Sequence, residues 1–323
     1  MGGLVSVVVV SWNSAPYLPR CLDGIRRQTW RDLELIAVDN ASSDDSAKLL
    51  EEGGRLVRPG TDGTSALLRN DTNRGFSAAV NQALAVARGE FLLIVNPDCF
   101  LEPEYVERLV AAFDADDIGS ATGLLLRARG FEIEPMEEVD SAGMRMTRNG
   151  RHLDITDRPD ARTEVFGVSG AAGMFRVAFL RDAAIGGEVF DEDFFAYRED
   201  ADLAWRGRLF GWRAVCEPGA VAYHVRRVTP EARNALPADI NMHSVKNRFL
   251  LRWKNEGWYL ALRNAPFELA RDLVVLLAAL AIEHLSLPAF GWLWRNRARV
   301  SAKRREIQRR RKVSDRELAR WFR

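Results

Sequence analysis

The alternation of short apolar runs with helical patterns constrains the fold of this chain more than any other feature. Val5–Val10 is rich in β-branched residues and has no helical period, and Leu33–Val38 and Phe91–Val95 are similar runs. Between the first two, Tyr17–Gln28 places apolar residues at helical spacing. Runs without alternation are typical of parallel strands buried on both faces. Strands that alternate with helices predict an open α/β sheet.

Polar residues follow each of these predicted strands. Ser11 and Asn13 come after the first strand, Asp39 ends the second, and Asn96 and Asp98 follow the most apolar one. Ligands of open α/β sheets bind beyond the carboxyl ends of the strands. Oxygen ligands such as Asn96 and Asp98 suit magnesium or manganese bridging a diphosphate. The alternative for these two residues is a Pro-Asp turn that only ends the strand.

A turn at Asn73-Arg74-Gly75 precedes a predicted helix over Ser77–Ala87. A helix N-terminus beside an arginine is a natural seat for a phosphate. A plain turn is the alternative. From Gly119 to about Asp160 the pattern loosens into a short predicted strand at Gly123–Leu126, loops and a hairpin at Asn149-Gly150. Because loops that line a site often carry specificity, we expect part of the ligand selectivity here.

The stretch Phe190–Arg206 contains six carboxylates among five aromatic residues. Burying carboxylates is costly unless a cation, a hydrogen bond or a proton compensates. A semi-buried acidic site is therefore predicted, with an acidic helix start over core aromatics as the alternative. Upstream, the glycine-rich segment around Gly170 and Ala171 suggests backbone packed closely against a ligand or a strand. His224 ends a predicted strand, and a lone histidine is more often structural than a ligand.

Charge is unevenly distributed along the 323 residues, whose net charge is +1. Thirteen Lys or Arg against three acidic residues give 295–323 a net charge of +10, so the remainder carries 1 − 10 = −9. A basic tail on an acidic body indicates an anionic surface as partner. Cys21, Cys99 and Cys216 fit no metal spacing, and we expect free thiols in a reducing compartment. The N-terminus lacks the pattern of a signal peptide.

A second amphipathic pattern covers 267–287. Its uncharged centre, Leu273–Ile282, has ten residues and is too short to span a bilayer. The charged residues Glu268, Arg271, Asp272 and Glu283 fall on one side and leave a broad apolar face. Tryptophans and the basic tail follow. We expect this helix to lie on an anionic lipid surface. The alternative is a helix docked on the preceding domain with a solvated tail.

Six segments occur together in an order that resembles glycosyltransferase family 2. They are Val7–Asn13, Val38–Ser42, Asn73–Phe76, Asn96–Asp98, Ser169–Ala171 and Phe190–Leu203. Asp140–Gly143 and Asn149–Arg151 are also similar to bacterial rhamnosyltransferases of that family. The resemblance covers roughly residues 4–255. It implies the GT-A fold, a Rossmann-like open mixed sheet flanked by helices. The expected domains are 1–255, with a nucleotide half to about 118 and an acceptor half from about 119, and a helical, basic region over 256–323.

The resemblance also implies roles for single residues. Asp39 resembles the acid that contacts the nucleotide base, and Asp98 the second acid of the Asp-X-Asp metal motif, with Asn96 in place of the first. His224 matches a histidine that completes the metal site, and Asp200 resembles the catalytic base. Further positions expected to contact the nucleotide or its diphosphate are Ser11, Asn13, Asn73, Arg74, Gly75 and Asn96. Positions expected to contact the donor or acceptor sugar are Gly170, Ala171, Glu199 and Trp205.

The implied activity is inverting transfer of a single sugar, with rhamnose favoured, because the Gln-X-X-Arg-Trp motif of processive relatives is missing from the sequence. The implied partners are Mn²⁺ or Mg²⁺, dTDP-rhamnose or a UDP-sugar, and a saccharide or lipid-linked acceptor at the inner face of the cell membrane. Two alternatives stay open: a nucleotide-sugar-binding protein without turnover, and a nucleic-acid binder acting through the basic tail. The acidic body makes the second a poor fit.

Overall fold

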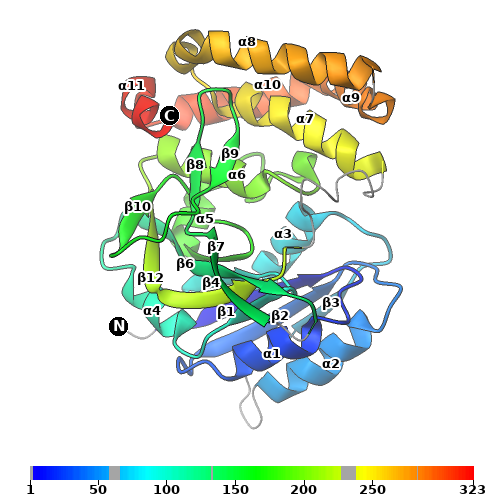
Figure 1. The fold of residues 1–323 in the computed structure, drawn as a ribbon, viewed down its shortest axis with the longest axis vertical. Coiled ribbons are helices and arrows are strands. Elements are labelled where there is room, and N and C mark those ends of the chain that lie inside the picture. The colour runs from blue at the N-terminus through cyan, green and yellow to red at the C-terminus, as the bar shows by residue number, and fades with distance from the viewer. Residues whose placement is uncertain (1–2, 58–65, 132–133, 227–237, 282) are drawn as a thin grey trace.

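The computed structural model describes residues 3–57, 66–131, 134–226, 238–281 and 283–323. These residues form a ten-stranded mixed sheet with helices on both faces, and a further helical layer from the C-terminal part of the chain (Figure 1). One hydrophobic core lies on each face of the sheet, and a third lies under the C-terminal helices. The predicted GT-A-like arrangement of an open sheet flanked by helices is confirmed.

The first part of the sheet is parallel, in the order β3–β2–β1–β4. Every residue of β1, β2 and β4 is buried, as the apolar runs predict. The register pairs Ser11 with Asp39, so the polar ends of β1 and β2 lie side by side. The elements are β1 (Val5–Ser11), α1 (Leu18–Arg26), β2 (Leu33–Asp39), α2 (Ser46–Val57), β3 (Ala66–Arg69), α3 (Phe76–Val86) and β4 (Phe91–Val95).

The rest of the sheet continues from β4 through the antiparallel strand β11 (Ala172–Arg176) to β6 (Ile118–Arg129) and β12 (Arg213–His224). The short β5 (Cys99–Leu101) pairs with β12 and places His224 opposite Cys99. β6 is longer than the sequence predicts, because glycine, serine and threonine dilute its apolar pattern. The remaining strands are β7 (Glu134–Ser141), β10 (Thr163–Val165) and the predicted hairpin β8 (Met144–Met146) and β9 (His152–Asp154).

Two helices that follow β11 in the chain pack on the same face of the sheet as α3. They are α5 (Val177–Ala183) and α6 (Glu199–Leu209), which contribute Phe179, Leu180 and Leu203 to that core. On the opposite face, α4 (Tyr105–Ala111) packs with α1 and α2. A short 3₁₀ turn, η1 (Glu192–Phe194), leads toward α6, so the acidic stretch stands between the sheet and the C-terminal helices.

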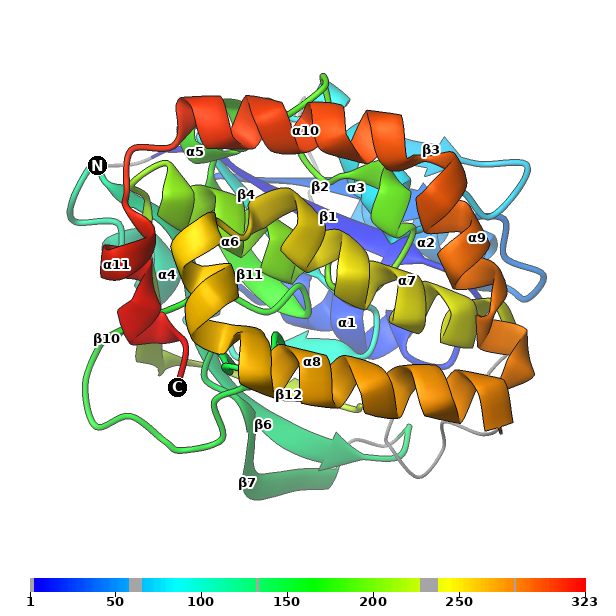
Figure 2. The same ribbon diagram turned by 90° about the horizontal axis from the view of Figure 1, so that it is seen from above.

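The C-terminal helices cover the end of the molecule opposite α1 and α2 (Figure 1), and seen from above they frame the helix α7 (Figure 2). Trp205 of α6, Leu250 of α7 and Phe322 at the end of the chain contribute to their shared core. The elements are α7 (Ala238–Asn255), α8 (Trp258–Ala281), η3 (His284–Ser286), α9 (Pro288–Arg295), α10 (Arg297–Arg310), α11 (Asp315–Leu318) and η4 (Ala319–Trp321).

The hydropathy of the described helices bears on the predicted interfacial segment. No single helix among the described residues is both long and apolar enough to cross a membrane. By length and composition, α8 together with His284–Arg295 passes such a test as a pair, with a bend of 114° between them. α8 begins earlier than the sequence predicts and contains Pro266 in its third turn.

All three cysteines are buried free thiols, as predicted. Burial raises the pKa of each thiol, to about 12 for Cys216. They therefore pack as small hydrophobic groups and are not poised as nucleophiles.

Candidate active site

Two buried oxygens at the carboxyl ends of β1 and β2 have no partner in the described part of the chain. They are Oγ of Ser11 and Oδ1 of Asp39. The other carboxylate oxygen of Asp39 accepts a hydrogen bond from the backbone N–H of Ser42 at 3.3 Å. Buried polar atoms are nearly always hydrogen-bonded, so an unpartnered pair at two adjoining strand ends fits a ligand that supplies the missing donor. The geometry favours Ser11 and Asp39 as binding residues.

Asn40 organises the loop before α3. Its side-chain oxygen accepts hydrogen bonds from Asn70 Nδ2 and the Arg74 N–H, both at 3.0 Å. Its amide nitrogen donates to Asn73 Oδ1 at 2.8 Å and to the Gly75 carbonyl at 3.3 Å. The loop is therefore fixed beside β2, with its backbone leading into the N-terminus of α3. Asn40 lies in a segment that resembles the family, but sequence reasoning gave it no role.

The predicted site residues in the loops, Asn13, Asn73, Arg74 and Gly75, make different kinds of contact. Asn73 accepts from the Gly75 N–H at 2.9 Å, and Asn13 accepts from the Ser43 N–H at 2.8 Å, so both side chains shape loops. Arg74 is exposed and forms no ion pair with any described residue. Gly75 has φ of +84°, and a Cβ there would lie 2.6 Å from the Phe195 ring. Only glycine therefore fits this position.

Asp98 and His224 come together where β5 pairs with β12. Oδ1 of Asp98 lies 3.6 Å from Nε2 of His224, and Nδ1 of His224 contacts Oδ2 of the buried Asp140 at 2.8 Å. Burial opposes the imidazolium, but the hydrogen bonds and charges of Asp140 and Asp98 raise the pKa of His224 to about 9. Asn96 is half-buried, and its backbone N–H donates to the Ala171 carbonyl at 2.8 Å.

The donor chemistry of this pair suits a divalent cation. Asp98 offers a carboxylate, and a carboxylate on the far nitrogen of a ligating histidine is the usual outer-shell arrangement. In the described part of the chain no three His, Cys, Asp or Glu residues gather as a metal cluster. A cation at Asp98 and His224 would thus take its other ligands from diphosphate and water, and it would have to replace a proton on His224.

Asp200, at the second position of α6, lies beside the glycine-rich segment. Its Oδ2 accepts from the Gly170 N–H at 3.2 Å, and its Oδ1 accepts from the Ala201 N–H at 2.7 Å. Burial raises the pKa of this carboxyl, against the lowering effect of the two backbone N–H groups, and the charge of Asp154 adds to the rise. The structure thus joins Asp200, Gly170 and, through the Ala171 carbonyl, the end of β4.

Glu199 is buried next to Asp200, and its Oε2 has no hydrogen-bond partner among the described residues. Burial, with the charges of Asp200 and Asp202, raises its pKa well above the ordinary value.

Asp154 forms an ion pair with Arg226 at 2.5 Å, and Arg226 also contacts Asp140 at 3.0 Å. A chain of charged groups therefore runs from the Asp98–His224 pair to the neighbourhood of Asp200.

Trp205 does not line this site. Its side chain is fully buried and packs against Phe166 and Phe322, with ring centroids 6.3 Å and 5.0 Å away. The side of helix α6 that carries Trp205 faces the C-terminal helices. The expected sugar contact is therefore corrected to a packing role, because a large aromatic residue fills the core more often than a binding site.

Asp191 and Asp202 of the stretch are neutralised by cations. Asp191 contacts Lys254 and, at 2.6 Å, Lys303. Asp202 accepts from Lys254 at 2.9 Å and from Arg206 at 2.9 Å. Burial alone would raise the pKa of Asp191, but the two lysines hold it well below its usual range. The positive charge that offsets the cost of burying these acids therefore comes from lysines of α7 and α10.

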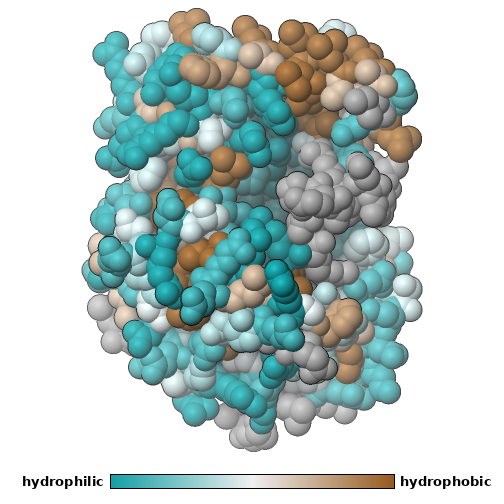
Figure 3. All heavy atoms as spheres, in the orientation of Figure 1, coloured by the Kyte–Doolittle hydropathy of each residue, from teal (hydrophilic) through white to brown (hydrophobic). Residues whose placement is uncertain are grey.

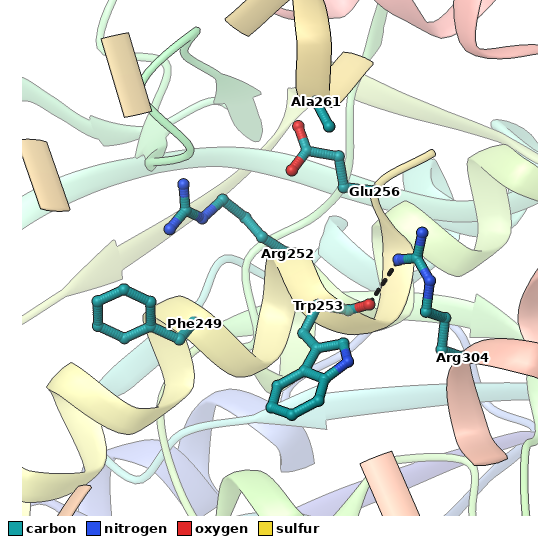
Figure 4. Close-up of a pocket in the computed structure, with 6 residues that line it drawn as sticks. All are labelled: Phe249, Arg252, Trp253, Glu256, Ala261 and Arg304. Carbon is teal, nitrogen blue, oxygen red and sulfur yellow. Dashed lines mark hydrogen bonds between the residues drawn. The ribbon is translucent and has the colours of Figure 1, made fainter. Parts of the chain in front are cut away.

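A pocket of about 320 Å³ lies elsewhere, among α7, α8 and α10 (Figure 4). Its lining residues are Phe249, Arg252, Trp253, Glu256, Ala261 and Arg304. Arg304 donates to the Trp253 carbonyl at 2.6 Å. These residues all belong to the C-terminal layer and contribute nothing to the site at Asp98 and Asp200.

Comparisons with known proteins agree with this geometry. Residues 6–181 match the family Glycosyl transferase family 2. The chain is 31% identical to "Putative glycosyltransferase EpsH" of Bacillus subtilis over 35% of its length and 32% of the relative. It thus spans about a third of that relative. It is 25% identical to the "N-acetylglucosaminyl-diphospho-decaprenol L-rhamnosyltransferase" of Mycobacterium tuberculosis, over 81% of the chain and 88% of the relative.

Solved structures share the fold. The mannosyltransferase PcManGT from Pyrobaculum calidifontis, in complex with GDP-Man and Mn²⁺, superposes with a TM-score of 0.57 at 20% identity, over 95% of this chain and 85% of that one. TarS of S. aureus, in complex with UDP-GlcNAc, superposes with a TM-score of 0.56 at 17% identity, over 82% of this chain and 70% of that one. The family match covers more than half of the chain, including both orphaned oxygens and Asp98. The chain belongs to glycosyltransferase family 2.

Proposed function

We propose that the protein is an inverting glycosyltransferase that moves a single sugar, with rhamnose favoured, from a nucleoside-diphosphate sugar to a hydroxyl of a saccharide or lipid-linked acceptor. The expected setting is synthesis of a cell-surface polysaccharide. The observation that carries the proposal is Asp200, a carboxylate of raised pKa held by the Gly170 and Ala201 N–H groups. The preference for rhamnose is supported by the relative that matches over 81% of the chain.

In this mechanism Asp200 accepts the proton of the attacking hydroxyl. The oxygen forms a bond to the anomeric carbon from the face opposite the diphosphate, and the bond between that carbon and the phosphate oxygen breaks. Backbone hydrogen bonds to both carboxylate oxygens orient Asp200 for this transfer. A raised pKa makes it a stronger base than an ordinary aspartate at neutral pH.

The donor would lie across the carboxyl ends of β1, β2 and β4. The unpartnered oxygens of Ser11 and Asp39 would accept from the imide N–H of uracil or thymine. Arg74, together with the N-terminus of α3, would face the diphosphate. Mn²⁺ or Mg²⁺ held by Asp98 and His224 would supply positive charge to the leaving group. This arrangement favours dTDP-rhamnose or a UDP-sugar as donor.

The test is a panel of dTDP-rhamnose, UDP-GlcNAc and GDP-mannose with Mn²⁺ or Mg²⁺, first in a thermal-shift assay and then with lipid-linked saccharide acceptors. We expect one donor to raise the melting temperature and to give a product of inverted anomeric configuration by NMR. A product of retained configuration contradicts the mechanism. Binding without release of nucleoside diphosphate, with every acceptor, supports the alternative of a nucleotide-sugar-binding protein.

A further inference from the structure

The exposed side of helix α8 carries no polar residue. Every residue of α8 that is exposed to solvent is apolar or proline. They are Trp258, Leu262, Pro266, Phe267, Leu269, Ala270, Leu273, Val274, Leu276, Leu277, Leu280 and Ala281. Leu262 is 71% exposed and Leu269 is 68% exposed. Figure 3 shows hydrophobic residues gathered at this end of the molecule. We call this set the α8 apolar face.

The charged residues of α8 face the protein instead. Asp272 contacts Arg248 at 3.2 Å and Arg252 at 2.5 Å, and the buried Glu268 contacts Arg252 at 3.0 Å. Removing one member of such a pair leaves an uncompensated charge, so these contacts fix how α8 is rotated about its axis. The helix is therefore amphipathic in the sense opposite to that of an ordinary surface helix. Its acidic side faces the protein and its apolar side faces outward.

This face is too extensive for a protein surface that meets only water. α8 has 24 residues and is thus about 36 Å long. Soluble monomers rarely expose apolar patches beyond a few hundred Å², and larger ones mark sites of interaction with proteins or membranes. Protein interfaces carry about one hydrogen bond per 100–200 Å² and a polar rim. The α8 apolar face offers no side-chain donor or acceptor except the exposed Trp258 N–H, which favours lipid as its occupant.

The segment that follows α8 has the features of a membrane interface. Leu285 and Trp294 lie in this segment and are 65% and 68% exposed. Exposed Arg295 and Arg297 follow, and the Arg297 guanidinium lies 4.4 Å from the Trp294 ring centroid. Tryptophan and arginine beside an apolar helix suit the headgroup level of a bilayer with anionic lipids.

We propose that the α8 apolar face docks the protein in the plane of an anionic bilayer, as a peripheral protein at the inner face of the cell membrane. The ion pairs to α7 hold α8 flat against the domain, so it lies in the interface and does not span it. The C-terminal layer then stands between the lipid and the sheet, and a lipid-linked acceptor would approach from that layer. This docking rests on the geometry of α8 and does not require the proposed transfer reaction.

The test compares two variants of the full chain in a vesicle flotation assay. Leu273→Gln/Leu277→Gln/Leu280→Gln changes three exposed positions and should leave the fold intact. Val86→Gln/Phe131→Gln changes exposed apolar residues outside the C-terminal layer and is the matched control. The vesicles are phosphatidylcholine with phosphatidylglycerol, and phosphatidylcholine alone. We expect the triple variant to bind at least about tenfold more weakly than the wild type and the control.

We also expect weaker binding to phosphatidylcholine alone than to vesicles with phosphatidylglycerol. Wild-type protein that binds neither vesicle overturns the proposal, as does a triple variant that binds like the wild type. Light scattering gives the remaining outcome. A wild-type dimer that the triple variant converts to monomer would assign the face to a second copy of the chain and overturn docking on lipid. Sugar transfer is not measured, so these outcomes are independent of the proposed activity.

A second, independent observation concerns the segment before Asp200. Phe195, Tyr197 and Arg198 have φ values of 65°, 68° and 71°, in the left-handed region that residues with side chains rarely adopt. Such conformations are energetically unfavourable and persist only where surrounding contacts hold them. The segment 195–198 therefore needs an external support, and it leads directly into Glu199 and Asp200.

Asn247 of α7 supplies that support. Its fully buried amide nitrogen donates to the carbonyls of Phe194 at 2.9 Å and of Ala196 and Tyr197 at 2.8 Å. On the other side, the Ser77 N–H at the start of α3 donates to the Phe195 carbonyl at 3.2 Å. The strained segment is thus held between α7 and the helix at the nucleotide site.

We infer that Asn247 is a positioning residue for the general base, an inference that rests on the proposed function. In Asn247→Ala the segment relaxes and Asp200 moves relative to the acceptor hydroxyl. We expect kcat to fall by about 10- to 100-fold, because displacements of about 1 Å have effects of this size. The KM for the donor should stay within about twofold. Arg252→Gln, on the same helix but facing α8, is the control and should keep kcat while its melting temperature falls.

Donor-induced thermal shifts check that each variant is folded, and Asn247→Ser, which keeps one donor, replaces the alanine variant if that one does not fold. Partial recovery of kcat in Asn247→Ser supports positioning. An unchanged kcat in a folded Asn247→Ala overturns it, as does an equal loss in Arg252→Gln. Absence of transfer by the wild type would instead count against the proposed function itself.

Discussion

Two groups of carboxylates lie within twelve residues of each other and behave in opposite ways. Asp191 and Asp202 are fully buried and contact Lys254, with further cations from α10 and α6. Glu199 and Asp200 have no cation in direct contact among the described residues. The pKa is lowered for Asp191 and raised for Glu199 and Asp200. The first group fastens the C-terminal helices to the domain, whereas the second contains the carboxylate that we propose as the proton acceptor.

The difference shows that burial alone does not identify a functional acid. All of these carboxylates are removed from water to a large extent, and what separates them is whether a lysine from α7 or α10 reaches them. Lys254 and Lys303 are far from the acidic stretch in the sequence, by 63 and 112 residues from Asp191. Part of the basic tail thus neutralises acidic residues inside the protein. Only the rest of its positive charge is left for the predicted external anionic surface.

The largest effect is expected from a substitution that breaks the ion pairs of Asp191. Asp191→Asn leaves Lys254 and Lys303 without their shared carboxylate, and the free energy of unfolding should fall by about 3–5 kcal/mol. Chemical denaturation measures this, with Asp23→Asn as the control. Asp23 forms ion pairs with exposed Arg26 and Arg27, where the loss should stay below about 1 kcal/mol.

The same residue sets a pH dependence. Because the folded pKa of Asp191 lies below the unfolded value of about 3.9, its contribution is fully present above that pH and is lost as the pH falls below it. The stability difference between wild type and Asp191→Asn should therefore shrink in acid. A difference that stays constant from neutral pH down to strong acid would show that the lysine pairs do not stabilise the fold.

A smaller effect of opposite sign is expected for the unpaired group. Glu199→Gln removes a buried carboxylate that lacks a cation, so the free energy of unfolding should rise by about 0.5–2 kcal/mol at neutral pH. The folded pKa is raised, so Glu199 favours folding below its unfolded pKa and this contribution is lost as the pH rises. The gain should consequently grow with pH. A loss of stability comparable to that of Asp191→Asn would erase the distinction between the groups.

The smallest effect concerns the electrostatic coupling of Asp154 to Asp200. The negative charge of Asp154 contributes to the raised pKa of Asp200. In Asp154→Asn the acidic limb of the pH profile of kcat/KM should move to lower pH, because a base of lower pKa stays deprotonated further into acid. A profile that moves to higher pH, or does not move, would mean that Asp200 is not the group titrating in that limb.

Much of the sheet could be predicted from the sequence because its strands are encoded locally. The runs of β1, β2 and β4 are almost entirely apolar on both faces, and a polar residue ends or directly follows each strand. Asp39 and Asp98 are predicted as site residues from their place at strand ends, and Asp200 from an ordered set of motifs, and their roles stay predictions. The long strand β6 was harder, because small residues such as Gly119, Ser120 and Gly123 hide its pattern.

The parts that could not be predicted depend on contacts between distant segments. Nothing near Asp191 in the sequence indicates Lys303, and nothing near Asn247 indicates that its amide holds the segment before Asp200. Trp205 shows the converse error, since the resemblance implied a sugar contact, while the helix turns it into the core. The partners of the charged side of α8 were likewise hidden. Nothing near Asp272 in the sequence indicates that Arg248 and Arg252 bind it from α7.

The central claim, that Asp200 is the base and its paired neighbours are structural, is tested most directly by the turnover of Asp200→Asn. Single-turnover kinetics with saturating donor and acceptor should show a rate lower by about a hundredfold or more, while donor affinity and the unfolding midpoint stay at wild-type values or above. Transfer by Asp200→Asn at a rate near that of the wild type would contradict the account.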